Sequence, residues 1–249
     1  MADALLAIEG LTKRFGGVIA SDNIVLDVVP GELHAVIGPN GAGKTTLIHQ
    51  ISGALVPDAG QIHFDGRNVT ELPMPARARL GLARSFQITH VLPRFTALEN
   101  VALAVQARSG SSFRFWQPAA AEEALNTPAM EALATLGVAG RAQTRAGTLS
   151  HGEKRLLEIA IALAQAPKLL LLDEPMAGAG AEETRRLVET LKRLKRRYTI
   201  VLVEHDMHAV FALADRISVL VEGRIIATGT PDAVRSDAAV RAAYLGDAA

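Results

Sequence analysis

The apolar residues of the chain fall into short runs, and the spacing of these runs predicts alternating strands and helices. Short apolar runs between turn residues are typical of strands, and longer runs with helical periodicity are typical of helices. We expect strands over Leu5–Glu9, Ile24–Val28, His34–Ile37, Gln61–Asp65, Lys168–Asp173 and Thr199–Glu204, and then a closing pair of strands. We expect helices from near Gly43 and over Gly152–Gln165, Glu182–Lys195 and Met207–Ala214. This alternation predicts an α/β fold with a parallel sheet.

The pattern changes between about Ile88 and Thr148. Strand signals disappear there, and Ala, Leu and Glu dominate Leu98–Ala107 and Ala119–Leu136. We expect a helical lobe over about 88–148, inserted into one domain that spans residues 1–249. The α/β part of that domain then occupies about 1–87 and 149–249.

Composition narrows the class of protein. The chain has 249 residues, 49% of them hydrophobic, which is enough to bury the core of one sizeable domain. Lys and Arg number 26, as do Asp and Glu, whereas a dedicated nucleic-acid binder carries a basic excess. The absence of cysteine excludes disulfides, thiolate zinc sites and cysteine nucleophiles. With no apolar run of roughly 18–20 residues and no signal-peptide pattern, we expect a cytosolic chain that reaches a membrane only by docking onto another subunit.

A glycine-rich loop follows the strand at His34–Ile37. Gly38–Thr46 matches the phosphate-binding pattern G-x-x-x-x-G-K-[ST] in full, between a strand and a helix. Backbone N–H groups and the helix dipole favour phosphate there, while Lys44 would reach the β and γ phosphates and the Thr45 hydroxyl would bind Mg²⁺. The expected nucleotide contacts in this loop are Gly38, Asn40, Gly41, Gly43, Lys44, Thr45 and Thr46.

Two carboxylates follow the run Leu169–Leu172. A continuous apolar run is typical of a strand buried on both faces of a parallel sheet. Its end would deliver Asp173 and Glu174 beside the phosphate loop. Asp173 would hold Mg²⁺ through water, and Glu174 would act as general base on the attacking water.

Together with these motifs, Leu149–Glu153 makes the chain resemble the ABC ATPases. Ser150 stands where a helix N-cap belongs, which would create a second anion site. In the family this signature segment closes over the γ-phosphate of ATP held by the partner subunit, so the resemblance implies that Ser150 and Gly152 bind nucleotide in the opposite subunit. His151 and Glu153 depart from the commonest form of the segment.

The resemblance assigns three further residues. Gln87 occupies the place of a glutamine that senses Mg²⁺ and water and links to the transmembrane subunits. His205 resembles the histidine that contacts the γ-phosphate, and Phe15 the aromatic residue that stacks on adenine. The implied catalytic set is Glu174, His205 and Gln87, with Thr45, Gln87 and Asp173 as Mg²⁺ ligands. Gly180 stands where the family usually has an Asp that couples the two sites of the dimer. The sequence therefore leaves open how the two sites communicate.

The finer resemblance is to the LivG-type ATPases of branched-chain amino-acid importers. It rests on Lys13–Gly17, Gly38–Thr46, Glu204–Met207 and Ala243–Gly246. It implies a P-loop NTPase core with a parallel sheet, an antiparallel β subdomain and an inserted α-helical subdomain. The implied cofactors are ATP and Mg²⁺. The implied partners are two permeases, a LivF-type ATPase or a second copy of the chain, and indirectly a periplasmic or extracellular binding protein, with no nucleic acid. The resemblance also implies that the chain is a peripheral subunit on the cytoplasmic side of the inner membrane.

Several alternatives stay open at this point. Relatives of the same type serve urea uptake or lipopolysaccharide export, and the solute itself is not encoded in this chain. A soluble ABC ATPase acting on ribosomes or DNA is a rival, although those classes carry two cassettes or a long coiled coil. A small-molecule P-loop kinase would explain Gly38–Thr46 but not Ser150, Gln87 and His205.

Overall fold

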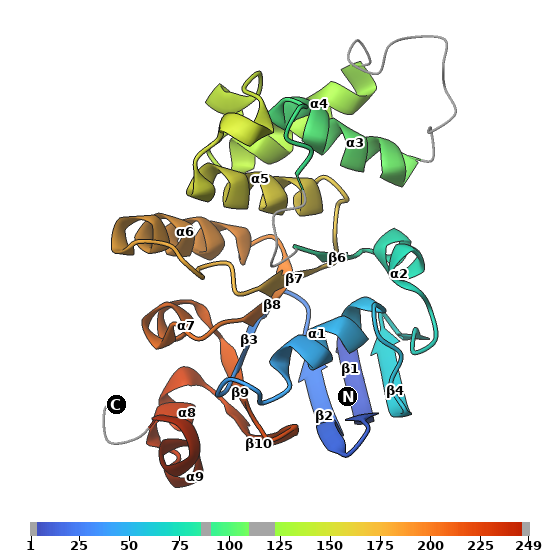
Figure 1. Cartoon of the computed structure of the whole chain (residues 1–249), viewed down its shortest axis with the longest axis vertical. Coiled ribbons are helices and arrows are strands. Elements are labelled where there is room, and N and C mark those ends of the chain that lie inside the picture. The colour runs from blue at the N-terminus through green and yellow to red at the C-terminus, as the bar shows by residue number, and fades with distance from the viewer. Residues whose placement is uncertain (1–3, 86–90, 110–122, 246–249) are drawn as a thin grey trace.

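The computed structural model describes residues 4–85, 91–109 and 123–245. Within them the strands form two sheets (Figure 1). The larger sheet has the order β10-β9-β3-β8-β7-β6. Its strands are β3 (Leu33–Ile37), β6 (Leu82–Arg84), β7 (Leu169–Asp173), β8 (Thr199–Val203), β9 (Arg216–Val221) and β10 (Arg224–Gly229). All neighbours pair in parallel except β9 and β10, which confirms the predicted parallel sheet.

The central strands of this sheet are buried on both faces. Every residue of β3, β7 and β8 is buried, because alternate side chains enter two separate cores. Leu170 and Leu172 pack in one core with helices α5 (His151–Leu163), α6 (Ala181–Leu194) and α7 (Met207–Leu213). Leu169 and Leu171 pack in the other core with helix α1 (Lys44–Ser52) and the smaller sheet. The continuous apolar run of β7 is therefore explained by burial on both faces of the strand.

The smaller sheet is antiparallel, with the order β2-β1-β4-β5. Its strands are β1 (Leu6–Phe15), β2 (Val18–Val28), β4 (Ala59–Phe64) and β5 (Arg67–Asn68). β1 and β2 run well beyond the predicted Leu5–Glu9 and Ile24–Val28 and form a long hairpin that ends with Phe15 opposite Val18. Among the extra residues only Leu11 and Ser21 are buried, and the others show no apolar alternation, so the strand-to-strand ladder defines them rather than the sequence pattern.

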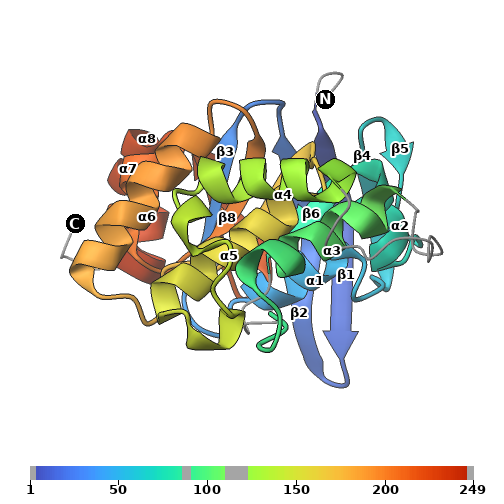
Figure 2. The ribbon, with the colours of Figure 1, turned by 90° about the horizontal axis from the view of Figure 1, so that it is seen from above.

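The helices divide between the sheets and one end of the molecule. Those around the sheets are α1 (Lys44–Ser52), α2 (Met74–Leu80), α6 (Ala181–Leu194), α7 (Met207–Leu213), α8 (Pro231–Ser236), α9 (Ala238–Val240) and the π-helical turn Arg241–Leu245. Those at the end are α3 (Ala97–Ser109), α4 (Glu123–Thr135) and α5 (His151–Leu163), with 3₁₀ turns at Ala139–Arg141 and Ala146–Thr148. α5 contacts both α3 and α4 and lies between them and the larger sheet (Figures 1 and 2). The subdomain boundaries near 88 and 148 stay a prediction.

One buried arginine holds the carboxyl end of α1. The Arg77 side chain, from α2, is only 1% exposed, and burial lowers the pKa of Arg77 to about 10. Its guanidinium donates to the carbonyls of Gln50 and Ile51, at 2.7 Å each, and to those of Thr70 and Leu72. Because buried polar groups need partners, these bonds fix α1 relative to α2. The sequence pattern gave no sign of this role.

A second buried polar group ties β3 to β9. His34 Nδ1 lies 2.8 Å from Glu32 Oε1, and His34 Nε2 lies 2.8 Å from Ser218 Oγ. All three side chains are buried, so this Ser-His-Glu arrangement joins strands rather than meeting a substrate. Burial opposes ionisation of Glu32, but the hydrogen bonds from His34 and from the Val29 N–H hold the pKa of Glu32 below its ordinary value of 4.5.

Replacing Glu32 with Gln is therefore expected to reduce stability in a pH-dependent way. Hydrogen bonds to a buried carboxylate contribute about 1–3 kcal/mol, which the variant should lose at neutral pH. Since the folded pKa of Glu32 is depressed, this contribution is complete above the unfolded pKa and is lost as pH falls through the lower folded pKa. Urea unfolding between about pH 7 and pH 3 should show that the difference in the free energy of unfolding between the wild type and Glu32→Gln becomes smaller as the pH falls. The exposed Glu71→Gln variant is the control, and a gap that stays constant with pH would contradict this assignment.

Candidate functional site

The strand order of the larger sheet brings three distant segments to one edge. β8 lies between β3 and β7, with Val203 paired to Val36 on one side and to Asp173 on the other. Because parallel strands end at the same edge, the glycine-rich loop, the pair Asp173-Glu174 and His205 leave the sheet side by side. The fold thus assembles most of the predicted site residues from sequence positions far apart.

The loop that follows β3 has no room for side chains at two glycines. A Cβ on Gly38 would lie 1.9 Å from the Leu220 carbonyl oxygen, and one on Gly43 would lie 2.2 Å from that of Ala20. Both residues also have positive φ, 155° and 105°, which L side chains rarely adopt. Gly43 directly precedes α1, so the loop delivers the helix N-terminus to the edge of the sheet.

Lys44 lies inside this loop. Its Nζ donates to the carbonyls of Gly38 and Pro39 at 2.7 and 2.9 Å. Burial lowers the pKa of Lys44, and the negative charges of Glu174 and Asp173 oppose that change. The lysine and both carboxylates therefore share one electrostatic environment, as the sequence predicted. Of the two threonines that follow, Thr45 is exposed and Thr46 half-buried.

Asp173 has an ion-pair partner that sequence reasoning missed. Its Oδ2 lies 2.9 Å from Nη2 of Arg84, a residue at the end of β6, and both side chains are at least nine-tenths buried. Arg84 Nη1 also lies 3.3 Å from Ser52 Oγ. The guanidinium therefore orients the carboxylate at the end of β7. A carboxylate and the Thr45 hydroxyl are hard oxygen donors of the kind that Mg²⁺ takes, so these residues fit that ion. The third predicted ligand, Gln87, lies outside the described residues.

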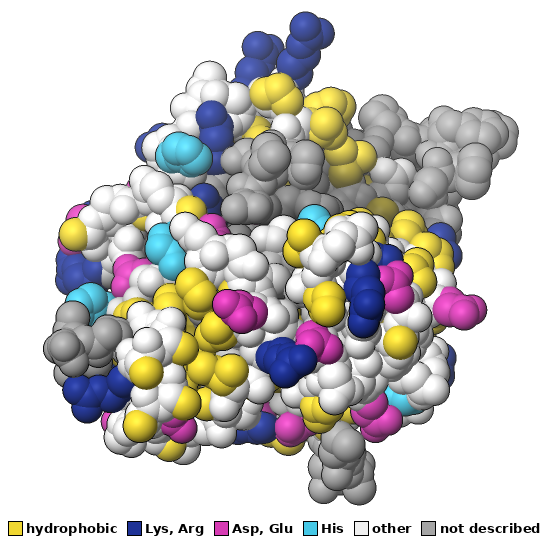
Figure 3. Space-filling model, turned by 60° about the horizontal axis from the view of Figure 1, so that its bottom comes forward, with side chains coloured by type: hydrophobic (Ala, Val, Ile, Leu, Met, Phe, Trp, Pro, Cys, Tyr) yellow, Lys and Arg dark blue, Asp and Glu magenta, His cyan; other side chains and the backbone are white. Residues whose placement is uncertain are grey.

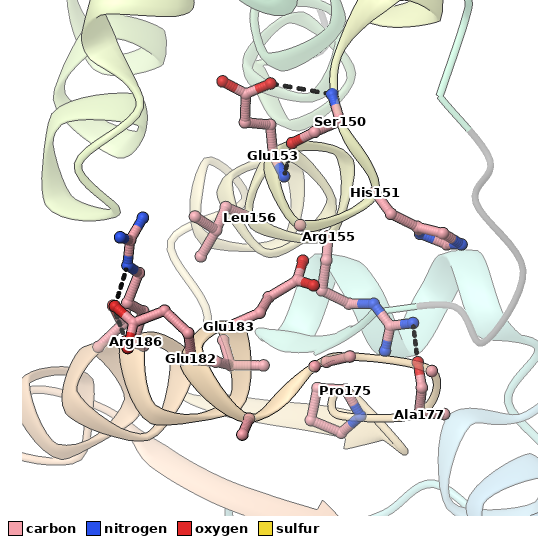
Figure 4. A pocket seen from close by; sticks show the side chains of 17 residues that line it. Ser150, His151, Glu153, Arg155, Leu156, Pro175, Ala177, Glu182, Glu183 and Arg186 are labelled. Atoms are coloured by element: carbon pink, nitrogen blue, oxygen red, sulfur yellow. Dashed lines mark hydrogen bonds and ion pairs between the residues drawn. The ribbon is translucent and has the colours of Figure 1, made fainter.

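Glu174 begins a tight turn that is held from α5. Its backbone is left-handed, with φ 46°, and its N–H donates to the Val203 carbonyl at 2.8 Å. Arg155 of α5 donates from Nη1 to the Glu174 carbonyl at 2.7 Å and from Nη2 to the Ala177 carbonyl at 3.3 Å (Figure 4). The conformation of the predicted general base thus depends on a residue of the helix that follows Ser150. No sequence pattern had singled out Arg155.

Two predicted nucleotide contacts are exposed. His205 lies two residues beyond the end of β8, and its side chain is 55% exposed. Phe15 ends β1 and is 50% exposed, with the Lys13 ammonium 5.8 Å from its ring centroid. The hairpin that carries Phe15 passes close to the loop, since the Ala20 carbonyl lies against Gly43. Both rings are therefore accessible to a ligand at the edge of the sheet.

Ser150 caps α5, as predicted. The Glu153 N–H donates to Ser150 Oγ at 3.3 Å, and the Ser150 N–H donates to Glu153 Oε2 at 2.9 Å, which forms a capping box. Ser150 and Gly152 line a pocket of about 560 Å³ together with Arg155 and the turn after Pro175 (Figure 4). None of the described residues of the glycine-rich loop lines this pocket. This pocket therefore joins the capped helix N-terminus to the turn after Pro175 and not to the phosphate loop.

No helix in the described part of the chain is long and apolar enough to cross a membrane.

Comparisons with known proteins identify the family of this chain. Residues 21–177 match the family model of ABC transporters, and residues 224–249 match that of branched-chain amino acid ATP-binding cassette transporters. The high-affinity branched-chain amino acid transport ATP-binding protein LivG of Escherichia coli (strain K12) is 38% identical, and the alignment covers 100% of both chains. The corresponding protein BraF of Pseudomonas aeruginosa is 36% identical with the same coverage.

Solved structures match over nearly the whole chain. MJ1267, an ATP-binding cassette of an ABC transporter in its ADP conformation, superposes with a TM-score of 0.85 at 30% identity and covers 98% of this chain and 99% of its own. The dimeric bacterial ABC transporter cassette MJ0796 gives 0.78 at 25% identity, covering 91% of this chain and 98% of its own. The chain therefore belongs to the ABC transporter family, as an ATP-binding subunit homologous to the branched-chain amino-acid importer ATPases LivG and BraF.

Proposed function

We propose that this chain hydrolyses MgATP at the carboxyl edge of its larger sheet and couples the reaction to import of a small solute, a branched-chain or other amino acid. The observation that carries the enzymatic part is the shared environment of Lys44, Asp173 and Glu174, reached from two strands. The match of residues 224–249 to the branched-chain amino-acid cassette model supports the choice of solute.

Each side chain at the edge has one role in this proposal. Lys44 binds the β and γ phosphates, and backbone N–H groups of the glycine-rich loop bind the remaining phosphate oxygens. Phe15 stacks on the adenine ring. Mg²⁺, held by Thr45, Asp173 and Gln87, would offset phosphate charge. Glu174 accepts the proton of the attacking water, and His205 contacts the γ-phosphate from the end of β8.

A complete site requires two ATPase subunits in this proposal. Ser150 and Gly152 lie at the N-terminus of α5, in a pocket that none of the described residues of their own phosphate loop lines, which supports their use by the opposite subunit. The dimeric structure of the cassette MJ0796 supports the pairing of two such subunits. The partner is a LivF-type ATPase or a second copy of this chain. Loss of the γ-phosphate, which both subunits hold, would then reopen the pair.

The remaining partners are proposed from the homology to the importer ATPases LivG and BraF. The pair of ATPases docks onto two permease subunits at the cytoplasmic face of the membrane, as peripheral subunits, and an external binding protein delivers the solute. A nucleic-acid partner has no support, since net charge is zero and basic and acidic side chains are interspersed on the face in Figure 3. A soluble ABC ATPase, or one for urea uptake or lipopolysaccharide export, is the alternative.

A pull-down from the native host tests the transport role. Tagged protein is recovered from detergent-solubilised membranes, and its partners are identified by mass spectrometry. We expect two permeases and an ATPase, with a solute-binding protein that binds branched-chain amino acids. An untagged strain is the control for background. Recovery of ribosomes, or of no membrane protein, would contradict the transport role without touching the nucleotide chemistry. A partner that binds urea or lipopolysaccharide would keep the transport role but change the proposed solute.

A further inference from the structure

A buried carboxylate joins the two catalytic segments at the edge of the sheet. The Glu204 side chain is 0% exposed and lies between the turn after Glu174 and the start of the His205 segment. Its Oε1 accepts the Met176 N–H at 2.6 Å, and its Oε2 accepts the His205 N–H at 2.9 Å. One side chain therefore binds backbone from both segments at once.

The same segments are held at their other ends. Arg155 binds the carbonyls of Glu174 and Ala177, on either side of Met176. Beyond His205, the Asp206 N–H lies 3.4 Å from Glu204 Oε2, and Asp206 Oδ1 accepts the Ala209 N–H at 3.1 Å as the N-cap of α7. The backbone of His205 is thus fixed on both sides while its ring stays exposed.

The cost of burying Glu204 indicates that its contacts are specific. A buried carboxylate is strongly unfavourable unless hydrogen bonds satisfy it. Burial raises the pKa of Glu204, and the N–H groups of Met176, His205 and Asp206 oppose that rise. Hydrogen bonds to a charged acceptor are about twice as strong as those to a neutral one, so they favour a single geometry of the two segments. The proposed reaction gives the Glu204 carboxylate no other task.

We propose that Glu204 is a positioning residue, which sets the distance between the Glu174 turn and His205 through its bonds to Met176 and His205. This inference rests on the roles proposed above for Glu174 and His205. Displacement of a catalytic group by about 1 Å can cost about 100-fold in rate. The inference therefore concerns the chemical step, whereas ATP binding depends on the phosphate loop and Phe15.

The direct test is Glu204→Gln. Glutamine has nearly the same size, but its NH₂ group must face a backbone N–H where the carboxylate had an acceptor. We expect kcat for ATP hydrolysis to fall about 10- to 100-fold, with KM for ATP within about threefold of the wild type. Hydrogen exchange should become faster at the amides of both Met176 and His205. Glu204→Asp keeps the charge and should restore part of kcat; it also serves if the Gln variant folds poorly.

Two further variants separate positioning from general damage. Glu32 is the matched control, since it is also a buried Glu that accepts a backbone N–H and lies next to a His. Glu32→Gln should lose stability but keep kcat at a temperature where it is folded. In a double-mutant cycle with His205→Ala, the combined loss in kcat should be much smaller than the product of the single losses, because the distance that Glu204 sets matters only while the His205 side chain is present.

The outcomes discriminate clearly. The inference is overturned by a Gln variant with kcat within twofold of the wild type, by a rise in KM that matches the fall in kcat, or by multiplicative losses in the cycle. Wild-type protein that lacks ATPase activity even together with its partner ATPase would instead contradict the proposed function. In that case, joint loss of amide protection at Met176 and His205 still supports the link, and loss at one of them alone overturns it.

Discussion

Replacement of Glu174 by Gln is expected to abolish ATP turnover while leaving ATP binding intact. The amide cannot accept a proton from water, so general-base catalysis, which contributes about 10²–10⁴-fold, is lost. Lys44 and the glycine-rich loop are unchanged, so the Kd for ATP should stay within about twofold of the wild type. Because ATP is then bound but not cleaved, the closed dimer should accumulate. Phosphate release and size-exclusion chromatography with ATP and Mg²⁺ measure the two effects.

Glu222 provides the control for this variant. It has the same left-handed backbone as Glu174, with φ 47° against 46°, and lies exposed in the turn between β9 and β10. Glu222→Gln should therefore reproduce any effect of the side-chain change in such a turn without removing the base. Turnover by Glu174→Gln close to that of the wild type would show that another group activates the water.

Replacement of Arg84 by Ala is expected to produce the largest loss of stability among these variants. It leaves the Asp173 carboxylate, 2% exposed, without its 2.9 Å partner. Breaking a buried ion pair by removing one partner costs about 3–5 kcal/mol in the free energy of unfolding. For a chain of this size that corresponds to a fall in Tm of about 6–20 °C. Calorimetry or urea unfolding without nucleotide measures the change.

Two comparisons identify the cause of that loss. The double variant Arg84→Ala/Asp173→Ala should be less destabilised than Arg84→Ala, because the unpaired buried charge is gone. Arg185→Ala, which breaks the exposed pair with Glu182, should leave Tm nearly unchanged because solvent screens that pair. An Arg84→Ala protein as stable as Arg185→Ala would mean that Asp173 is satisfied by other groups.

The pairing that these variants address was invisible in the sequence. Arg84 and Asp173 are 89 positions apart, and no sequence pattern singled out Arg84. Glu204 was part of the segment before His205 but had no role, and Arg155 was one charged residue among several after Ser150. The role of each of these side chains depends on its burial and on partners from other elements, and periodicity and spacing predict neither.

Strand length in the smaller sheet shows the same limit. Lys13 pairs with Ser21 and Arg14 with Ile19 in the extended hairpin, although none of these pairs belongs to an apolar alternation. Backbone hydrogen bonding between adjacent strands extends the sheet, so its residues need no hydrophobic face there. The approach of the hairpin to the phosphate loop, where the Ala20 carbonyl lies against Gly43, follows from that extension.

By itself the sequence determined the parts of this protein whose conformation depends on residues close together in the chain. The glycine-rich loop, the buried run that ends in Asp173 and Glu174, and the Ser150 cap each lie in one continuous segment, where residue type and spacing specify conformation. The family resemblance extended this to Phe15, Gln87 and His205, whose roles stay predictions. Only the tertiary structure decided how these segments are held together, through Arg84, Arg155 and Glu204. Their contacts form when strands distant in sequence become neighbours in one sheet, and burial then makes each polar pairing obligatory.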